Sequence, residues 1–529
     1  MNKRKNSASE AVRRIHLFPL RLIAEGLAVG VAAGLVVTVY RWLLQKAGVW
    51  LTAVLDATVG SPWKMAGWFA VLIVIALAVE KLVEWEPMIS GSGIPQLEGE
   101  MSGKLDQTWW KVLPAKFCGG FLCLLGGLSL GREGPSIQLG AMAGKALARL
   151  VSIGKSEEKY LLTCGASAGL AAAFHAPLAG VLFSLEEIHK NFSVSVLISV
   201  MTASVTADCL ASFFLGRDPV FQFRIYGDLP MEYFWMVLLL GLLLGVFGAF
   251  YNWFTLKSQE LYQRAAFLNS RTRLLLPFLA AGVLGYTVPA LLGSGGNLIT
   301  EITADQLGIG AALLLLAGKF LFSGVSFGSG APGGIFFPLL VLGGLAGGIF
   351  GMGCSELFGL PPEYVNNFVL LAMAGYFTAI VRAPLTGIIL IFEMTGSLSQ
   401  LETLTLVAGA AFVTAELLRS TPIYESLLLR ILKRQGIEVP KENQGKVLKE
   451  YVVMHCSRVE GRRIAQVSWP EHALIVSVRR GTEEILPRGS TRLMASDMLL
   501  IMVDEDCEGP VGDRISELCA ERPEEFTEI

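Results

Sequence analysis

Long apolar runs alternate with short polar stretches over the first four-fifths of the chain. The run from Tyr233 to Leu256 has 24 residues without a charged side chain. A helix that crosses a bilayer needs about 20 such residues, so this run predicts a membrane-spanning helix. Further spans are expected at 22–45, 66–85, 161–185, 193–216, 273–292, 308–322, 367–381 and 401–415. After residue 430 the pattern changes to short apolar runs among charged residues.

The distribution of charge predicts two bodies. The chain has 529 residues and is 53% hydrophobic and 17% charged, yet residues 431–529 hold 32 of its 88 charged side chains. We therefore expect residues 1–430 to lie in a lipid bilayer and residues 431–529 to form a small water-soluble domain. The net charge of −2 gives no sign of a nucleic-acid partner.

The basic residues suggest which side of the membrane holds the two ends. The first 16 residues carry five Lys or Arg and contain no apolar signal-peptide core. The soluble part follows "RILKRQ", which is also basic, so both termini are expected in the cytoplasm. The five histidines and eight cysteines show no CxxC and no ligand spacing, so no metal site is expected.

Two stretches of the apolar body resemble one another. "AGLAAAFHAPLAGVLFSLEE" (168–187) and "AGYFTAIVRAPLTGIILIFEM" (374–394) share A-G, then A-P-L-x-G, then a glutamate nine residues after the proline. The offset is 207 residues, and "GREGP" pairs with "GAPGG" at an offset of 199. This predicts an internal duplication with halves at about 20–215 and 230–425. Duplicated membrane folds commonly bind substrate on broken helices where the repeats meet.

Three glycine-rich stretches predict a binding site: "SGSGIP" (90–95), "GREGP" (131–135) and "GAPGGIFFP" (330–338). Each precedes an apolar segment and contains a proline, which a helix tolerates in its first turn. Helix N-termini offer free N–H donors and partial positive charge. Three such ends, with the hydroxyl of Ser92, would bind a small anion. The alternative for each stretch alone is a tight packing turn.

Glu133 is the unusual residue in these stretches. Between residues 117 and 144 the only charges are Arg132 and Glu133. A carboxylate at membrane depth is costly, by about 3 kcal/mol, and a helix N-terminus reduces that cost. There it would compete with a diffusing anion for the same donors and, once protonated, move away. Glu133 would then be both gate and proton acceptor; the alternative is a surface ion pair with Arg132.

The stretches "GSGIP", "GREGP" and "GAPGGIFFP", in this order, resemble the signatures of the CLC family of chloride channels and chloride/proton antiporters. The likeness covers about residues 20–430 and extends to "TPIYES". It implies an all-α polytopic membrane fold, an inverted repeat of broken and tilted helices. It also implies a homodimer with one pore in each subunit, no cofactor, and chloride and protons as substrates.

The resemblance assigns roles to individual residues. Ser92 and Tyr424 match the hydroxyls that contact the central anion, and the N–H groups of Ile335 and Phe336 would line the same site. Glu133 matches the external gating glutamate. The glycines of the motifs are Gly91, Gly93, Gly131, Gly134, Gly333 and Gly334.

Glu187, the second glutamate of "SLEEIH", matches the inner proton-transfer glutamate of the antiporters. Channel members commonly lack a carboxylate there, so an antiporter is expected, with a passive voltage- or pH-gated chloride channel as the alternative. Glu98 and Lys116 match a buried acid–base pair, interpreted as structural support. Glu393, the repeat-related partner of Glu186, is expected to pack at a helix end.

Two positions depart from the family pattern. His175 stands where relatives carry asparagine, and it is interpreted as a packing residue whose ring can titrate near neutral pH. Gln96 replaces an acid that is common after "GSGIP". Either departure could alter the response to pH.

Residues 431–529 resemble the C-terminal domain of potassium-conductance regulators, the RCK C or TrkA-C type. The likeness rests on strand-like runs at "ALIVSVRR" and "MLLIMV", with turn signals at 487–489 and 495–497. It implies an α/β domain that regulates transport through an unidentified cytoplasmic ligand. The alternative is an appendage that stabilises a dimer.

Two other classes of protein fit the sequence poorly. A potassium channel would need a TVGYG-type carbonyl filter, and "GYTVP" (285–289) has some of those letters in another order. An intramembrane enzyme would need a nucleophile with a positioned base, and Ser92 has no histidine in its motif. A prokaryotic inner membrane is the expected location.

Overall fold

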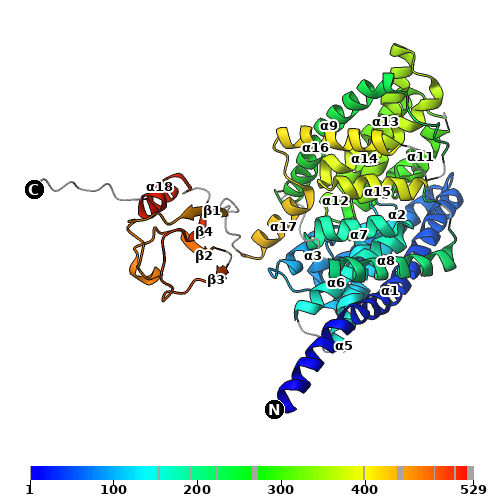
Figure 1. Cartoon of the computed structure of the whole chain (residues 1–529). Coiled ribbons are helices and arrows are strands. Elements are labelled where there is room, and N and C mark those ends of the chain that lie inside the picture. Colours follow the sequence, from blue (N-terminus) through cyan, green and yellow to red (C-terminus); the bar gives the residue numbers. More distant parts are fainter. Residues whose placement is uncertain are drawn as a thin grey trace, which may run out of the picture. The chain divides into compact units, whose positions relative to one another are not determined.

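The structure, a computed structural model, describes residues 2–151, 155–190, 194–217, 219–221, 223–264, 272–304, 306–396, 400–437, 446–481, 483–504 and 508–520 (Figure 1). The side chains of residues 2–19 are outside this description, and the expectation for the basic N-terminus rests on them. The chain divides into two compact units, Met1–Arg434 and Gln435–Ile529.

The first unit is helical. Its first half contains α1 Asn2–Thr58, α2 Pro62–Trp85, α3 Ile94–Met101, α4 Trp109–Leu125, α5 Glu133–Leu150, α6 Lys155–Phe174, α7 Pro177–Phe183 and α8 Val194–Leu215. Its second half contains α9 Phe234–Arg264, α10 Leu275–Thr287, α11 Gly296–Thr303, α12 Ile309–Gly328, α13 Phe336–Phe358, α14 Val365–Val381, α15 Pro384–Thr395 and α16 Leu401–Leu417. α17 Ile423–Arg434 follows the second half and crosses residue 430, where the sequence suggested a boundary.

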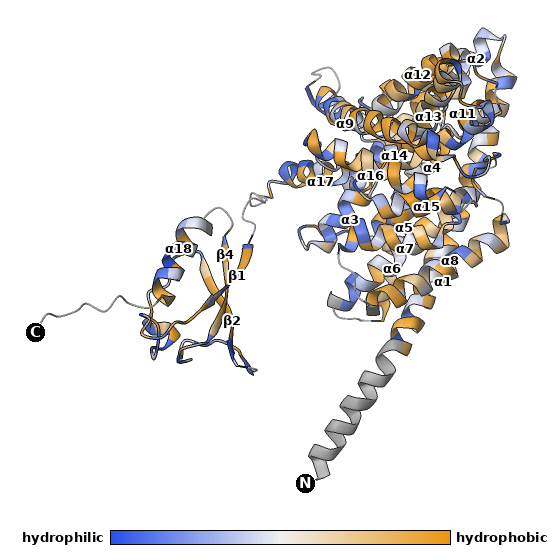
Figure 2. Ribbon diagram, turned by 45° about the horizontal axis from the view of Figure 1, so that its top comes forward, coloured by the Kyte–Doolittle hydropathy of each residue, from blue (hydrophilic) through white to orange (hydrophobic). Residues whose placement is uncertain are grey.

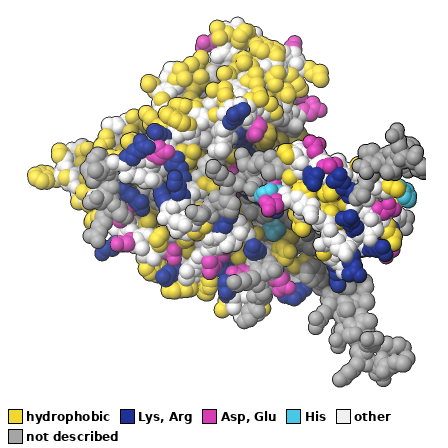
Figure 3. Space-filling view, turned by 90° about the vertical axis from the view of Figure 1, so that its left-hand side faces the viewer, with side chains coloured by type: hydrophobic (Ala, Val, Ile, Leu, Met, Phe, Trp, Pro, Cys, Tyr) yellow, Lys and Arg dark blue, Asp and Glu magenta, His cyan; other side chains and the backbone are white. Residues whose placement is uncertain are grey.

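Seven helices among the described residues are long and apolar enough to cross a membrane. They are Leu20–Thr58, Pro62–Trp85, Val196–Leu215, Met231–Arg264, Ile309–Gly328, Phe336–Phe358 and Pro362–Val381. Orange, apolar residues predominate along these helices in Figure 2. On the face of the helical body in Figure 3, charged side chains gather centrally and hydrophobic ones cover the upper margin. The chain is therefore an integral membrane protein.

Two expected spans are wrong in detail. The stretch 161–185 is not one helix, because α6 ends at Phe174 and α7 begins at Pro177. His175, between them, has a φ of +55°, which a continuing helix does not allow. The stretch 273–292 is also shorter than expected: α10 covers only Leu275–Thr287.

The repeat is visible in the order of the helices, because each of α1–α8 has a counterpart at the same place in the series α9–α16. For example, the short helices α3 and α11 are each third in their half. The predicted alignment of "GREGP" with "GAPGG" at an offset of 199 is wrong. α5 begins at Glu133 and α13 at Phe336, so the two helix starts lie 203 residues apart. The cause is Gly330, whose φ of +81° places it in a turn before the helix rather than at the helix start.

Glycines let the helices of the site pack closely. On α5 and α6, a methyl group on Gly140 would strike the backbone oxygen of Gly165, and one on Gly165 would strike that of Gly140. Close backbone approach at small residues is a common way to pack helices within a membrane. α13 and α14 make a similar contact at Gly347, where an added methyl group would strike the carbonyl of Phe368.

The second unit contains a four-stranded antiparallel sheet in the order β1-β4-β2-β3. The strands are β1 Lys446–Val452, β2 Ala473–Arg480, β3 Glu483–Ile485 and β4 Met498–Asp504, and α18 Glu508–Cys519 follows. The two predicted strands are thus confirmed as β2 and β4, whereas β1, β3 and α18 were not predicted.

A buried acid stabilises the second unit. Asp497 accepts two hydrogen bonds of 2.8 Å from Arg480 and one of 2.8 Å from the backbone N–H of Met494. Burial alone would raise the pKa of Asp497, but these hydrogen bonds outweigh it and lower the pKa below its usual value.

Candidate functional site

The three glycine-rich stretches meet in the middle of the helical body. The backbones of Gly131 and Gly334 exchange two hydrogen bonds, of 2.6 and 2.8 Å. Gly333 donates a hydrogen bond of 3.0 Å to the carbonyl of Gly91. The N-termini of α3, α5 and α13 therefore converge, as the sequence predicts.

Ser92 lies in the turn that begins α3. Gly93, the residue before the helix, has a φ of +96°, a conformation that glycine adopts without strain. The hydroxyl of Ser92 accepts a hydrogen bond of 3.2 Å from the N–H of Ile94. A methyl group on Gly134 would lie 2.7 Å from the carbonyl oxygen of Ser92, so glycine permits the close approach of α5 to this turn.

Ile335 immediately precedes α13 and Phe336 begins it, and Tyr424 lies in the first turn of α17. All three are buried. The ring of Phe336 lies 6.0 Å from that of Phe183, which in turn lies 6.5 Å from the ring of Tyr424. The hydroxyl of Tyr424 has no hydrogen-bond partner within the described part of the chain. The start of α13 and a free hydroxyl are thus packed around the same aromatic side chain.

Glu133 is fully buried at the first position of α5. Its carboxylate faces the backbone N–H of Phe337 and lies against Gly131. Arg132 is its ion-pair partner, with Nε 3.7 Å from Oε1. The surface ion pair considered from the sequence is wrong, because the Glu133 side chain is 0% exposed. The carboxylate instead occupies the position where helix N-termini meet.

Glu187 lies in a single π-helical turn, Ser184–His189, at the end of α7. Such turns are rare and are often found at functional sites. The carboxyl group of Glu187 neighbours that of Glu98, and Lys190 supplies a nearby positive charge. Both glutamates are buried. Two carboxyl groups side by side can share one proton, which suits a proton relay.

The expected pairing of Glu98 with Lys116 is wrong. The ammonium group of Lys116 donates hydrogen bonds of 2.8 and 2.6 Å to the carbonyls of Ile89 and Gly91, which precede Ser92. These two carbonyl oxygens, and not the carboxylate of Glu98, are therefore the hydrogen-bond acceptors of Lys116 among the described residues. Glu98 faces Glu187 instead.

Sequence reasoning missed the counterpart of Lys116 in the second half. Lys319, fully buried on α12, donates hydrogen bonds of 3.0 and 2.7 Å to the carbonyls of Leu291 and Gly293. Gly295, the residue before α11, has a φ of +89°. The signal was present in the sequence, because "GSG" occurs at both 91–93 and 293–295.

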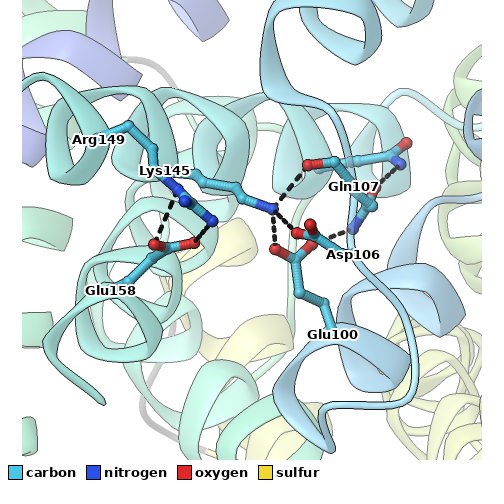
Figure 4. Close-up of polar contacts among 7 residues, drawn as sticks. Glu100, Asp106, Gln107, Lys145, Arg149 and Glu158 are labelled. Carbon is cyan, nitrogen blue, oxygen red and sulfur yellow. Dashed lines mark hydrogen bonds and ion pairs between the residues drawn. The ribbon is translucent and has the colours of Figure 1, made fainter. Parts of the chain in front are cut away.

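A buried lysine joins α5 to the far end of α3 (Figure 4). Lys145 forms an ion pair with Glu100 and donates hydrogen bonds of 2.6 Å to the carboxylate of Asp106 and to the carbonyl of Gln107. Gln138 of α5 donates a hydrogen bond of 2.6 Å to the side chain of Gln107. These contacts fix α5, which carries Glu133, relative to α3, which follows Ser92.

Glu186 and Glu393 connect the two halves reciprocally. Glu393 accepts hydrogen bonds of 3.0 and 2.8 Å from the N–H groups of Leu178 and Ala179 at the start of α7. Glu186 accepts hydrogen bonds of 2.9 and 2.8 Å from the N–H and hydroxyl of Thr386 on α15. The prediction that Glu393 packs at a helix end is confirmed. Such reciprocal contacts are what a two-fold relation between the halves produces.

His175 does not take part in the convergent site. Its Nδ1 lies 3.1 Å from the carboxylate of Asp208 and 3.2 Å from the hydroxyl of Ser212. Gln96 donates a hydrogen bond of 2.7 Å to the carbonyl of Ser90, next to the turn that contains Ser92. Of the two departures from the family pattern, Gln96 is therefore the one that touches the site. No cluster of metal-binding side chains occurs among the described residues.

The fold and this site define a class of membrane transporter. Residues 75–416 match the model of the voltage gated chloride channel family, and residues 448–506 match that of the TrkA-C domain. The chain belongs to the voltage gated chloride channel family, whose members are transporters and not enzymes.

Curated relatives are similar over most of the chain. The H(+)/Cl(-) exchange transporter ClcA of Vibrio cholerae is 35% identical over 428 residues, which are 79% of this chain and 92% of the relative. ClcA of Klebsiella pneumoniae is 34% identical over 458 residues, which are 82% of this chain and 96% of the relative.

Solved structures agree. A slow cyanobacterial Cl-/H+ antiporter superposes with a TM-score of 0.75 at 29% identity and covers 79% of this chain and 99% of its own. A CLC-type fluoride/proton antiporter superposes with a TM-score of 0.64 at 23% identity and shares the fold, covering 77% of this chain and 97% of its own.

Proposed function

We propose that the protein is a chloride/proton antiporter, which moves chloride and protons in opposite directions across a membrane. The observation that carries the proposal is the buried carboxylate of Glu133 at the convergence of the N-termini of α3, α5 and α13. Relatives of 33–35% identity are named H(+)/Cl(-) exchange transporters. A passive channel of the same fold is not favoured by these relatives.

Chloride would bind where the helix N-termini meet. The backbone N–H groups of Ile335 and Phe336 and the hydroxyls of Ser92 and Tyr424 would be its donors. Because none of these donors carries a full charge, the anion is attracted without being held too tightly to leave. The site dispenses with a cofactor, since its chemistry is hydrogen bonding to an anion.

Glu133 would couple the two ions. As a carboxylate, Glu133 would occupy the position at the helix N-termini that chloride needs. Chloride would therefore displace the Glu133 side chain most readily when that side chain is protonated. Glu187, beside Glu98, would receive a proton from the cytoplasm and pass it toward Glu133. Each proton would then cross the membrane only when chloride moves through the site in the direction opposite to that of the proton.

The soluble unit suggests regulation. We propose a transport domain at 1–430 and a regulatory domain at 431–529 that responds to an unidentified cytoplasmic ligand; the alternative is an appendage that stabilises a dimer. The match to the TrkA-C domain supports the division. The protein would be a homodimer in a prokaryotic inner membrane with both termini in the cytoplasm, and light scattering in detergent tests the dimer.

Reconstitution tests the function. The purified protein is placed in liposomes, a chloride gradient is imposed without a pH gradient, and the internal pH is recorded. An antiporter drives protons uphill against the chloride flow. Chloride flux without proton movement would contradict the proposal and indicate a channel.

A further inference from the structure

Tyr40, on α1, has a buried hydroxyl that has no part in the proposed antiport mechanism. Its side chain is 0% exposed, and its hydroxyl has no hydrogen-bond partner among the residues that the structure describes. The ring lies 5.2 Å from that of Phe117 on α4. The hydroxyl presses against Gly120 of α4, where an added methyl group would collide with it. Helix packing therefore holds this hydroxyl in one place.

The hydroxyl interacts electrostatically with the gating carboxylate. The titratable and charged groups that act on it are Cys123 on α4, Arg132, which precedes α5, and Glu133, the first residue of α5. Both α4 and α5 pack against α1. Glu133 is the carboxyl group among these neighbours, and its present position is against the N–H of Phe337.

A second cation interacts with Arg132. Arg41, the next residue of α1, is 6% exposed and donates a hydrogen bond of 3.1 Å to the carbonyl of Ala172. It interacts electrostatically with Arg132 and with Asp208. Arg132 interacts electrostatically with both Tyr40 and Glu133, so a carboxylate that moved toward Tyr40 would remain near this guanidinium group.

We propose that Tyr40 is a positioning residue whose hydroxyl receives the carboxyl group of Glu133 when chloride displaces that side chain from the helix N-termini. A tyrosine hydroxyl both donates and accepts, so it pairs with a carboxylate and equally with a carboxylic acid. This suits a partner that changes its protonation state during each cycle. The inference rests on the proposed function, because it assigns Glu133 two positions.

A double-mutant cycle in the full-length protein tests the inference. In liposomes, Tyr40→Phe is expected to slow chloride exchange about fivefold, the effect of one lost hydrogen bond. In a Glu133→Ala background, Tyr40→Phe is expected to change chloride flux less than about twofold, because no carboxyl group remains to be received.

A matched control comes from α14. Tyr376 is also 0% exposed with no hydrogen-bond partner in the described chain, and its electrostatic neighbour is Tyr251 rather than Glu133. Tyr376→Phe is expected to leave exchange within about twofold of the unmutated rate. An equal slowing by Tyr40→Phe with and without Glu133, or no slowing at all, would overturn the inference. Failure of the unmutated protein to move protons would instead contradict the antiporter, and the cycle on chloride flux would still be readable.

Discussion

In the first half of the helical body α3 begins after Gly93, and in the second half α11 begins after Gly295; both helices have eight residues. A buried lysine holds the turn before each of them, Lys116 in one half and Lys319 in the other. The scaffold is therefore duplicated down to single hydrogen bonds.

The three carboxylates assigned to gating and proton transfer are not duplicated, unlike the pair Glu186 and Glu393. Counting from the two helix starts and from the Ala-Pro-Leu motifs, Glu98, Glu133 and Glu187 correspond to Thr300, Phe336 and Met394. The first half would thus supply the groups that carry protons, whereas the second half contributes the N–H donors at the start of α13. Duplication provides two sets of helix N-termini, and the change of side chains in one set turns an anion site into a coupled one.

The largest effect expected from this comparison is at Glu133. Glu133→Gln should abolish proton movement while chloride still flows, because the amide of glutamine does not bind and release a proton as a carboxyl group does. The counterpart substitution Phe336→Leu keeps the backbone N–H and should keep proton coupling, with chloride affinity within about threefold. Liposome flux assays of both ions measure the difference; coupled exchange in Glu133→Gln would break the comparison.

Substitution of the two buried lysines should distinguish an effect on stability from an effect on chloride binding. Lys116→Met removes the hydrogen bond to the carbonyl of Ile89 and one of the two hydrogen bonds to the carbonyl of Gly91, which still accepts from Gly333. Lys319→Met removes the hydrogen bonds to the carbonyls of Leu291 and Gly293. Each substitution should cost about 3 kcal/mol of stability. Only Lys116→Met should also weaken chloride binding, by about tenfold, because its carbonyls precede Ser92. Thermal unfolding and chloride titration calorimetry test this pair; equal losses of chloride affinity would argue against a special role for the first half.

The reciprocal caps should behave alike. Glu186→Gln and Glu393→Gln each weaken hydrogen bonds at the start of a helix in the other half, and each should cost about 1 kcal/mol of stability. Matching decreases in the temperature of unfolding are expected. A cost for one substitution but not the other would show that the two-fold relation is only approximate there.

Local chemistry decided how much could be predicted from the sequence. The starts of α3 at Ile94 and of α13 at Phe336 could be predicted, as could the strands β2 and β4, because glycine, proline and apolar runs act over a few residues. The convergence at Glu133 was predictable because three similar motifs occur in one body. The carbonyl partners of Lys116, and the neighbours of Glu98, depend on which distant segments meet, which no short pattern contains.

The break between α6 and α7 at His175 also could not be predicted from the apolar pattern. Residues 161–185 are apolar enough to read as one helix, and the positive φ that divides α6 from α7 belongs to a histidine rather than a glycine. The proline at position 177 was the available signal, since proline favours the first turn of a helix. The repeat-related proline at position 384 likewise begins a helix, α15.

The most direct test of the central claim compares two adjacent glutamates. Glu187 faces Glu98, whereas Glu186 binds Thr386 at the start of α15. In liposomes with a chloride gradient, Glu187→Gln should lose uphill proton movement while chloride flux continues, and Glu186→Gln should keep the ratio of protons to chloride of the unmutated protein. Coupled proton movement that persists in Glu187→Gln would contradict the claim that the carboxylates of the first half carry the protons.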